Sequence, residues 1–109
     1  MEYGVTIAMG SDTIYEPLTE YGEYSLKEYK TMVECGMTVP QAVRAATVNS
    51  AAALNMLHKL GTLEPGKEAD MLVVRKDPYE SADVLYDASN IRSVISAGRL
   101  AVNEGLLAY

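Results

Sequence analysis

Residues 61–74 read GTLEPGKEADMLVV, and at this stretch the sequence changes from helical patterns to turn and strand patterns. Residues 64–67 place proline and glycine at the second and third positions of a predicted type II turn. Residues 71–74 form a short apolar run that predicts a strand. Residues 91–95 alternate in polarity and residues 100–102 return after a turn, which predicts a hairpin. The chain from residue 61 onward is therefore expected to be mainly β-structure.

The residues before this stretch have helical patterns instead. Ser25 and Glu28 match a capping box, which predicts a helix beginning at Ser25, and Gly36 is a natural stop for it. Thr38 and Gln41 match a second capping box, with a proline in the first turn, where its missing N–H has no helical partner to lose. Two consecutive helices are predicted.

One strand is predicted in this first half. Residues 5–9 (Val-Thr-Ile-Ala-Met) are nearly all apolar, include β-branched residues and end before Gly10, as in a strand that is covered on both faces. Asn49 is expected to cap a third short helix, residues 50–56. Because one strand cannot pair its own backbone groups, the chain is predicted to be a piece of a larger fold or to assemble with other copies.

The composition excludes several classes of protein. The chain has 109 residues, 49% of them hydrophobic and 22% charged, and a net charge of −6, which argues against a nucleic-acid-binding surface or a basic membrane-surface helix. No apolar run approaches the roughly 18–20 residues that cross a bilayer, and no secretory signal is recognisable. Cys35 is the only cysteine, so a cytoplasmic location is expected. His58 is the only histidine, which excludes a multi-histidine metal site within one copy.

Five segments of the chain together resemble the carboxyl-terminal portion of metal-dependent amidohydrolases, most closely the imidazolonepropionase-like and prolidase-like branch. The most specific of them is the stretch quoted above. The segments are residues 5–12, 32–42, 45–51, 61–74 and 94–99.

The resemblance implies an α/β fold in two parts. Family members are (β/α)₈ barrels with a small β-sandwich. Residues 1–60 are then expected to hold the last barrel strand and the terminal helices, and residues 61–109 part of the sandwich. Asp70, beside the strand at 71–74, is expected to specify the fold rather than to act in chemistry.

The same resemblance points to Asp12 as the catalytic residue. Active sites of these barrels lie at the carboxyl ends of the strands, where Asp12 follows residues 5–9. In the family this aspartate binds a divalent metal, with zinc expected, and acts as general base toward the attacking water. The other family ligands, mainly histidines on earlier strands, have no counterpart here, so Asp12 serves as a metal ligand only together with those missing barrel residues. No substrate-binding residue is assigned.

Two functional hypotheses follow. In the first, the chain is the carboxyl-terminal piece of an amidohydrolase that hydrolyses C–N bonds in a small cyclic amide or peptide-like substrate. It is then expected to bind no metal and to be inactive alone, with the amino-terminal barrel part as its partner. In the second, it is a non-catalytic α/β scaffold that self-associates through its strand edge and its tyrosine-rich first third, which holds Tyr3, Tyr15, Tyr21, Tyr24 and Tyr29.

Overall fold

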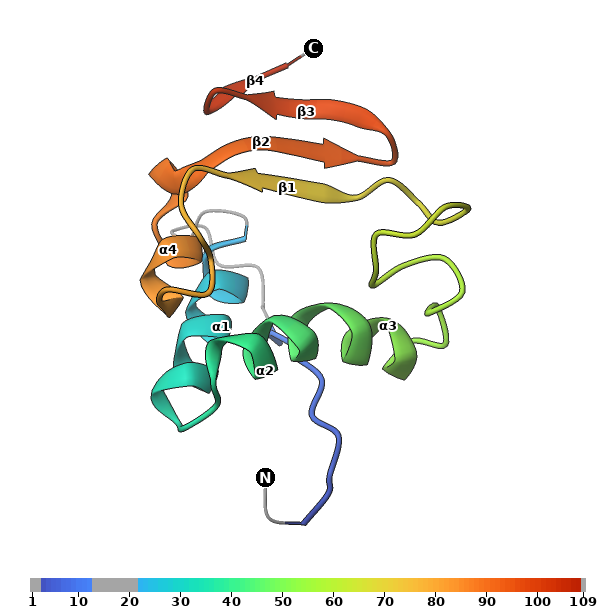
Figure 1. Cartoon of the computed structure of the whole chain (residues 1–109), viewed down its shortest axis with the longest axis vertical. Helices are drawn as coiled ribbons and strands as arrows, with labels where there is room; N and C mark the ends of the chain where they lie inside the picture. The colour runs from blue at the N-terminus through green and yellow to red at the C-terminus, as the bar shows by residue number, and fades with distance from the viewer. Residues whose placement is uncertain (1–2, 13–21, 109) are drawn as a thin grey trace.

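The computed structural model describes residues 3–12 and 22–108, which form a helical layer and a sheet layer (Figure 1). The helical segments are α1 (Glu23–Glu34), α2 (Val39–Arg44), the π-helical η1 (Ala45–Asn49), α3 (Ser50–Ala53), α4 (Ala82–Tyr86) and the short 3₁₀ segment η2 (Ala88–Asn90). The strands are β1 (Met71–Val74), β2 (Ile91–Ser96), β3 (Arg99–Asn103) and β4 (Leu106–Leu107). None of the helices in the described part has the length and apolarity needed to cross a membrane.

The four strands form one antiparallel sheet in the order β1-β2-β3-β4. The hairpin and the strand predicted at residues 71–74 are confirmed. Ala97 and Gly98, in the β2–β3 turn, both have positive φ angles of 48° and 76°, as tight hairpin turns require. The Asp70 carboxylate accepts the Ala97 N–H at 2.7 Å, so this acid ties the start of β1 to the β2–β3 turn. That contact gives Asp70 the structural role expected of it.

The turn before β1 also has its predicted form. Gly66 has a φ of 90°, and the Lys67 N–H donates to the Glu64 carbonyl at 3.2 Å. A type II turn needs a positive φ at its third position, which glycine adopts without steric cost.

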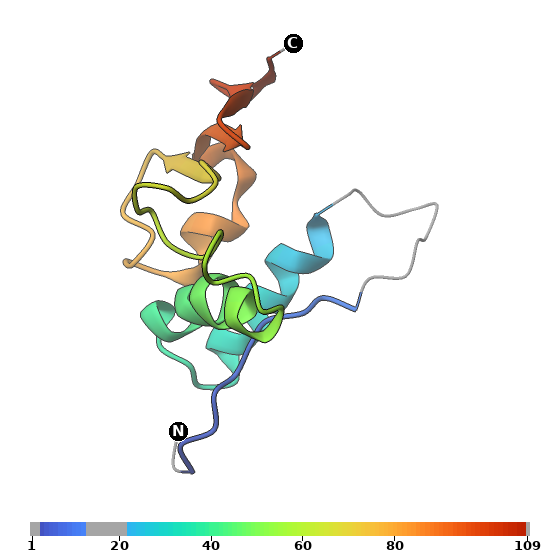
Figure 2. The ribbon, with the colours of Figure 1, turned by 90° about the vertical axis from the view of Figure 1, so that its right-hand side faces the viewer.

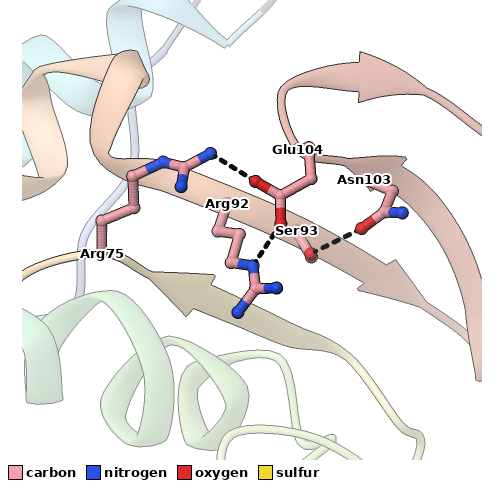
Figure 3. A network of polar contacts seen from close by, with 5 residues as sticks. All are labelled: Arg75, Arg92, Ser93, Asn103 and Glu104. Carbon is pink, nitrogen blue, oxygen red and sulfur yellow. Dashed lines mark hydrogen bonds and ion pairs between the residues drawn. The ribbon is translucent and has the colours of Figure 1, made fainter.

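A network of polar contacts links the end of β1, β2 and the turn between β3 and β4 (Figure 3). The Glu104 carboxylate accepts from Arg75 Nη2 at 2.7 Å and from Arg92 Nε at 2.5 Å. Ser93 Oγ donates to Asn103 Oδ1 at 3.3 Å between β2 and β3. The two arginines hold the pKa of the Glu104 carboxyl below its usual value, chiefly through the hydrogen bond from Arg75.

The first helix differs from the prediction at its start. α1 begins at Glu23 with Gly22 as N-cap in the left-handed conformation, so the helix starts two residues early and the predicted capping box of Ser25 is wrong. The glycine allows a chain reversal that leaves Ser25 inside the first turn. The helix ends as predicted, with Gly36 at a φ of 106°.

The capping box of the second helix is confirmed. Thr38 Oγ1 accepts the Gln41 N–H at 3.4 Å, and Gln41 Oε1 accepts the Thr38 N–H at 2.8 Å. Asn49, in contrast, caps nothing: its backbone is helical, and α2, η1 and α3 run on as one helical stretch. Because the helix continues through Asn49, the predicted cap is wrong, and α3 ends at Ala53 instead of at residue 56.

A small core joins α1, α2 and α4. Tyr29, Ala42 and Ala82 are buried in it, and Lys30 bridges α1 and α4 by an ion pair of 2.8 Å with Asp83. Within the described part, no large side chain is completely buried. Several large apolar side chains are exposed instead, including Leu54, Leu63, Leu72, Leu100, Leu106 and Leu107. Much of the apolar surface of this chain therefore lacks a cover from its own described residues.

Candidate functional site

Residues 5–9 form no β-strand in this structure, in which no strand of the described residues lies beside them. They run beside the helical stretch of α2, η1 and α3 (Figure 2). Among the described residues, the four strands of the sheet pair only with one another. Without a neighbouring strand, an apolar and β-branched segment has no ladder to join, whatever its propensity.

Helix groups bind this segment instead. Asn49 Nδ2 donates to the Ile7 carbonyl at 2.8 Å. The Met9 N–H donates to the Ala45 carbonyl at 3.1 Å and also lies 3.2 Å from Ser50 Oγ. These contacts satisfy backbone groups that would otherwise stay unpaired at the partly buried Ile7 and Met9.

The burial of residues 7–12 alternates between the two sides of the chain. Ile7, Met9 and Ser11 are partly buried, whereas the intervening small residues Ala8 and Gly10 are exposed. Alternation of this kind is the mark of an extended chain with one face covered. The segment therefore has one face toward the helices and one open face.

Asp12 follows Ser11 and lies on the exposed face of the chain, with Ala8 and Gly10. It is exposed and has a φ of 44°, which is uncommon for a residue other than glycine but tolerated by aspartate. Residues 13–21 lie outside the described part. An exposed carboxylate on a conformationally restricted backbone at the end of an anchored segment is the strongest candidate for chemistry here.

The other singled-out residues do not join Asp12. His58 is exposed in the connection after α3, and Cys35 is exposed at the end of α1. Within residues 3–12 and 22–108, no three His, Cys, Asp or Glu side chains gather closely enough to hold a metal ion. A catalytic zinc takes about three protein ligands, so the described residues of this chain do not by themselves fit such a metal.

The tyrosine-rich third is not one surface. Tyr3 is exposed, whereas Tyr29 is buried in the core and its hydroxyl has no hydrogen-bond partner among the described residues. Burial raises the pKa of the Tyr29 hydroxyl. Tyr15 and Tyr21 fall outside the described residues.

Sequence reasoning missed the roles of Asn49 and Ser50. It assigned Asn49 to a helix cap and gave Ser50 no task. The signal was nevertheless present, because an amide and a hydroxyl lie next to each other between Val48 and Ala51 in a helical stretch of mostly small or apolar residues. Such side chains in mid-helix often bond to something outside the helix's own ladder.

Comparison with known proteins decides the family. The model of the amidohydrolase family matches residues 1–101. The chain belongs to the amidohydrolase family. Within that family it is an imidazolonepropionase-like and prolidase-like member.

Two curated relatives show how far the likeness extends. An imidazolonepropionase of Geobacillus kaustophilus is 39% identical over 70 residues, which is 64% of this chain and 16% of that enzyme. An imidazolonepropionase of Symbiobacterium thermophilum is 33% identical over 107 residues, or 96% of this chain and 24% of that enzyme. The amidohydrolase chain thus spans between a sixth and a quarter of the length of these relatives.

A solved structure agrees with them. The crystal structure of a Xaa-Pro dipeptidase with methionine bound in its active site superposes with a TM-score of 0.76 and 38% identity. The match covers 91% of this chain and 23% of the dipeptidase. The arrangement of helices and sheet described above is therefore one that occurs within a larger enzyme of this family.

Proposed function

We propose that this chain supplies the carboxyl-terminal part of an amidohydrolase that hydrolyses C–N bonds in a small cyclic amide or peptide-like substrate. Residues 1–60 would provide the last barrel strand and the terminal helices, and residues 61–109 strands of the small β-sandwich. The segment at residues 5–9 supports this assignment, since it has a strand's alternation and an open face but no strand beside it among the described residues. The partial coverage of longer relatives agrees with it.

The observation that carries the proposal is the placement of Asp12. Its carboxylate is exposed at the end of a segment that the helix anchors at Ile7 and Met9. A carboxylate held at such an edge can accept a proton from a water that attacks an amide carbon, and can return it to the leaving nitrogen. We assign this general acid–base role to Asp12.

The divalent metal of the family, with zinc expected, requires ligands that the described residues do not gather. The amino-terminal barrel part would have to supply them, with Asp12 as this chain's contribution. The isolated chain is therefore expected to hydrolyse no amide. We infer a cytoplasmic enzyme in which the partner of this chain is the rest of the barrel.

A chimera tests the proposal. In the Symbiobacterium thermophilum imidazolonepropionase, this chain replaces the matched 107-residue segment, and hydrolysis of imidazolonepropionate and of a Xaa-Pro dipeptide is measured. The Asp12→Asn variant is expected to lower kcat by about 10²–10⁴-fold, because the general base is lost. Glu80→Gln removes a charge from another exposed acid and is the matched control, expected to change kcat little.

Two results would contradict the proposal. One is a chimera in which Asp12→Asn is as active as its parent. The other is hydrolysis of either substrate by the isolated chain with zinc added. A homo-oligomer of the isolated chain with a cooperative melt, and a chimera without activity, would favour the self-associating scaffold instead.

A further inference from the structure

The helical stretch beside residues 5–9 contains a π-helical segment where the two meet. η1 (Ala45–Asn49) separates α2 from α3, and the Ala45 carbonyl accepts from the Met9 N–H at 3.1 Å and from Ser50 Oγ at 2.7 Å. A π-turn holds one residue more per hydrogen-bonded turn than an α-turn and is found often at functional sites. Here it coincides with a mid-helix carbonyl that bonds to another segment.

The Ser50 hydroxyl has a single proton and can donate it to only one of two nearby carbonyls at a time. Its hydroxyl lies 2.7 Å from the Ala45 carbonyl and 3.1 Å from the Met9 carbonyl. If the proton goes to the closer Ala45 oxygen, a lone pair of Oγ is left for the Met9 N–H at 3.2 Å. In that arrangement Ser50 donates within its own helical stretch and accepts from the segment, so its acceptor oxygen links the two.

Asn49 adds a second point of attachment. Its side-chain amide donates to the Ile7 carbonyl at 2.8 Å, two residues before Met9 along the same face. Two attachments on one face fix both the position and the register of an extended chain. A slip of one residue would turn its covered face outward and its open face inward.

That register decides where Asp12 lies. Asp12 comes three residues after Met9 and is exposed, on the same side of the alternation as Ala8 and Gly10. Its φ of 44° lies in the left-handed region, which aspartate tolerates. The Met9 N–H contacts with Ala45 and Ser50 hold the chain three residues before Asp12.

We propose that Asn49 and Ser50 are positioning residues that hold the Asp12 carboxylate in its working place by fixing the register of residues 7–9 on the π-turn. The proposal rests on the function proposed above for Asp12. It assigns no contact between either side chain and the substrate.

The first test needs no activity. Hydrogen exchange of the Met9 amide is measured in the isolated chain and in Ser50→Ala and Asn49→Ala. Loss of these hydrogen bonds is expected to speed Met9 exchange by about fivefold to tenfold, while amides of β2 keep their rates. Thr47→Ala is the matched control, because the Thr47 hydroxyl donates to the Val43 carbonyl of its own helical stretch at 2.8 Å and, among the described residues, bonds to no other segment.

The second test uses the chimera with the Symbiobacterium thermophilum enzyme. Ser50→Ala and Asn49→Ala are expected to lower kcat by about tenfold to a hundredfold through misplacement of Asp12, with KM changed less than about twofold. Ser50→Thr keeps the hydroxyl and is expected to recover most of kcat. Thr47→Ala is expected to leave both kcat and KM unchanged.

The outcomes separate the two proposals. If Asp12→Asn abolishes turnover but Ser50→Ala and Asn49→Ala leave kcat unchanged, the positioning role is wrong and the function of Asp12 stands. The positioning role is equally wrong if Thr47→Ala lowers kcat as much as Ser50→Ala. If Asp12→Asn has no effect, the function assigned to Asp12 fails and the positioning role falls with it, even where Met9 exchange shows that the attachment exists.

Discussion

β2 and the segment at residues 5–9 satisfy their backbone hydrogen bonds in different ways. β2 lies between β1 and β3, and most of its residues pair with one or both of these strands, with a register shift in each ladder. The segment is held at Ile7 and Met9 by helix groups and is open on its other face. The difference shows that a ladder holds most residues of a strand from both sides, whereas attachment to helix groups holds a chain at a few points and leaves one edge free.

Proline substitution is expected to give the largest difference in stability between β2 and the segment at residues 5–9. Val94 pairs with Leu72 on one side and Val102 on the other, so Val94→Pro removes a ladder donor from a central strand and is expected to cost about 3 kcal/mol or more. Ala8 lies between the two attached residues, and its N–H has no acceptor among the described residues. Ala8→Pro is expected to change stability by less than about 1 kcal/mol.

Urea unfolding followed by circular dichroism measures both variants. Similar losses of stability in the two would mean that the segment is as fully paired as β2. The difference between the strand pairing of β2 and the helix contacts that hold residues 5–9 would then be wrong.

Glycine substitution tests the connection between the two regions. An added Cβ at Gly61, where φ is 91°, would lie 2.9 Å from Ala51 Cβ and 3.2 Å from the Thr47 carbonyl. Gly66 has a φ of 90° but nothing within 4 Å. Gly66→Ala is expected to cost about 1 kcal/mol from backbone strain, and Gly61→Ala about 1–3 kcal/mol more from overpacking.

Differential scanning calorimetry of the two variants gives the comparison. Hydrogen exchange locates the loss, which for Gly61→Ala is expected at residues 47–51 and at the attached segment rather than in the sheet. Equal melting temperatures for the two alanine variants would contradict the close packing of Gly61.

The smallest expected effect is a difference in pH dependence. The Glu104 pKa is lowered by hydrogen bonds from Arg75 and then Arg92, so its contribution to stability is present above the unfolded-state pKa and is lost as pH falls through the folded-state value. The contacts of Asn49 and Ser50 contain no ionisable group. Acid is therefore expected to weaken the sheet end around Glu104 and not the attachment of the segment.

Urea midpoints at neutral pH and at about pH 3 test this in the parent and in Glu104→Gln. The parent is expected to lose slightly more stability than the variant, because these side chains are exposed and water screens the pairs. An identical loss in both would show that Glu104 contributes nothing to the pH dependence.

The sheet could be predicted from the sequence because local signals set most of it. The proline and glycine of residues 64–67, the apolar run of β1 and the alternation of β2 each specify a turn or a strand within a few residues. The Thr38 capping box is local in the same sense. α4, η2 and β4 carry weaker signals, and their short lengths depend on packing against α1 or on the turn at Glu104 and Gly105.

The segment at residues 5–9 could not be predicted in the same way, because its conformation depends on neighbours distant in sequence. Its pattern specifies a strand, but the hydrogen-bonding partners available in this chain are Asn49, Ser50 and the Ala45 carbonyl. The start of α1 was missed because the left-handed conformation of Gly22 competes with the side-chain cap. The placement of Asp12 rests on family resemblance, and its position in a complete site is a proposal.

The π-turn has a consequence for how this part of the chain can vary in length. A π-turn holds one residue more per hydrogen-bonded turn than an α-turn, so a single deletion in η1 would let the stretch close as a continuous α-helix. The wide turn at which the Ala45 carbonyl and the Ser50 hydroxyl meet Met9 is then expected to be lost. Single deletions between Ala45 and Ser50 should therefore be rarer among natural variants than substitutions at the exposed Thr47.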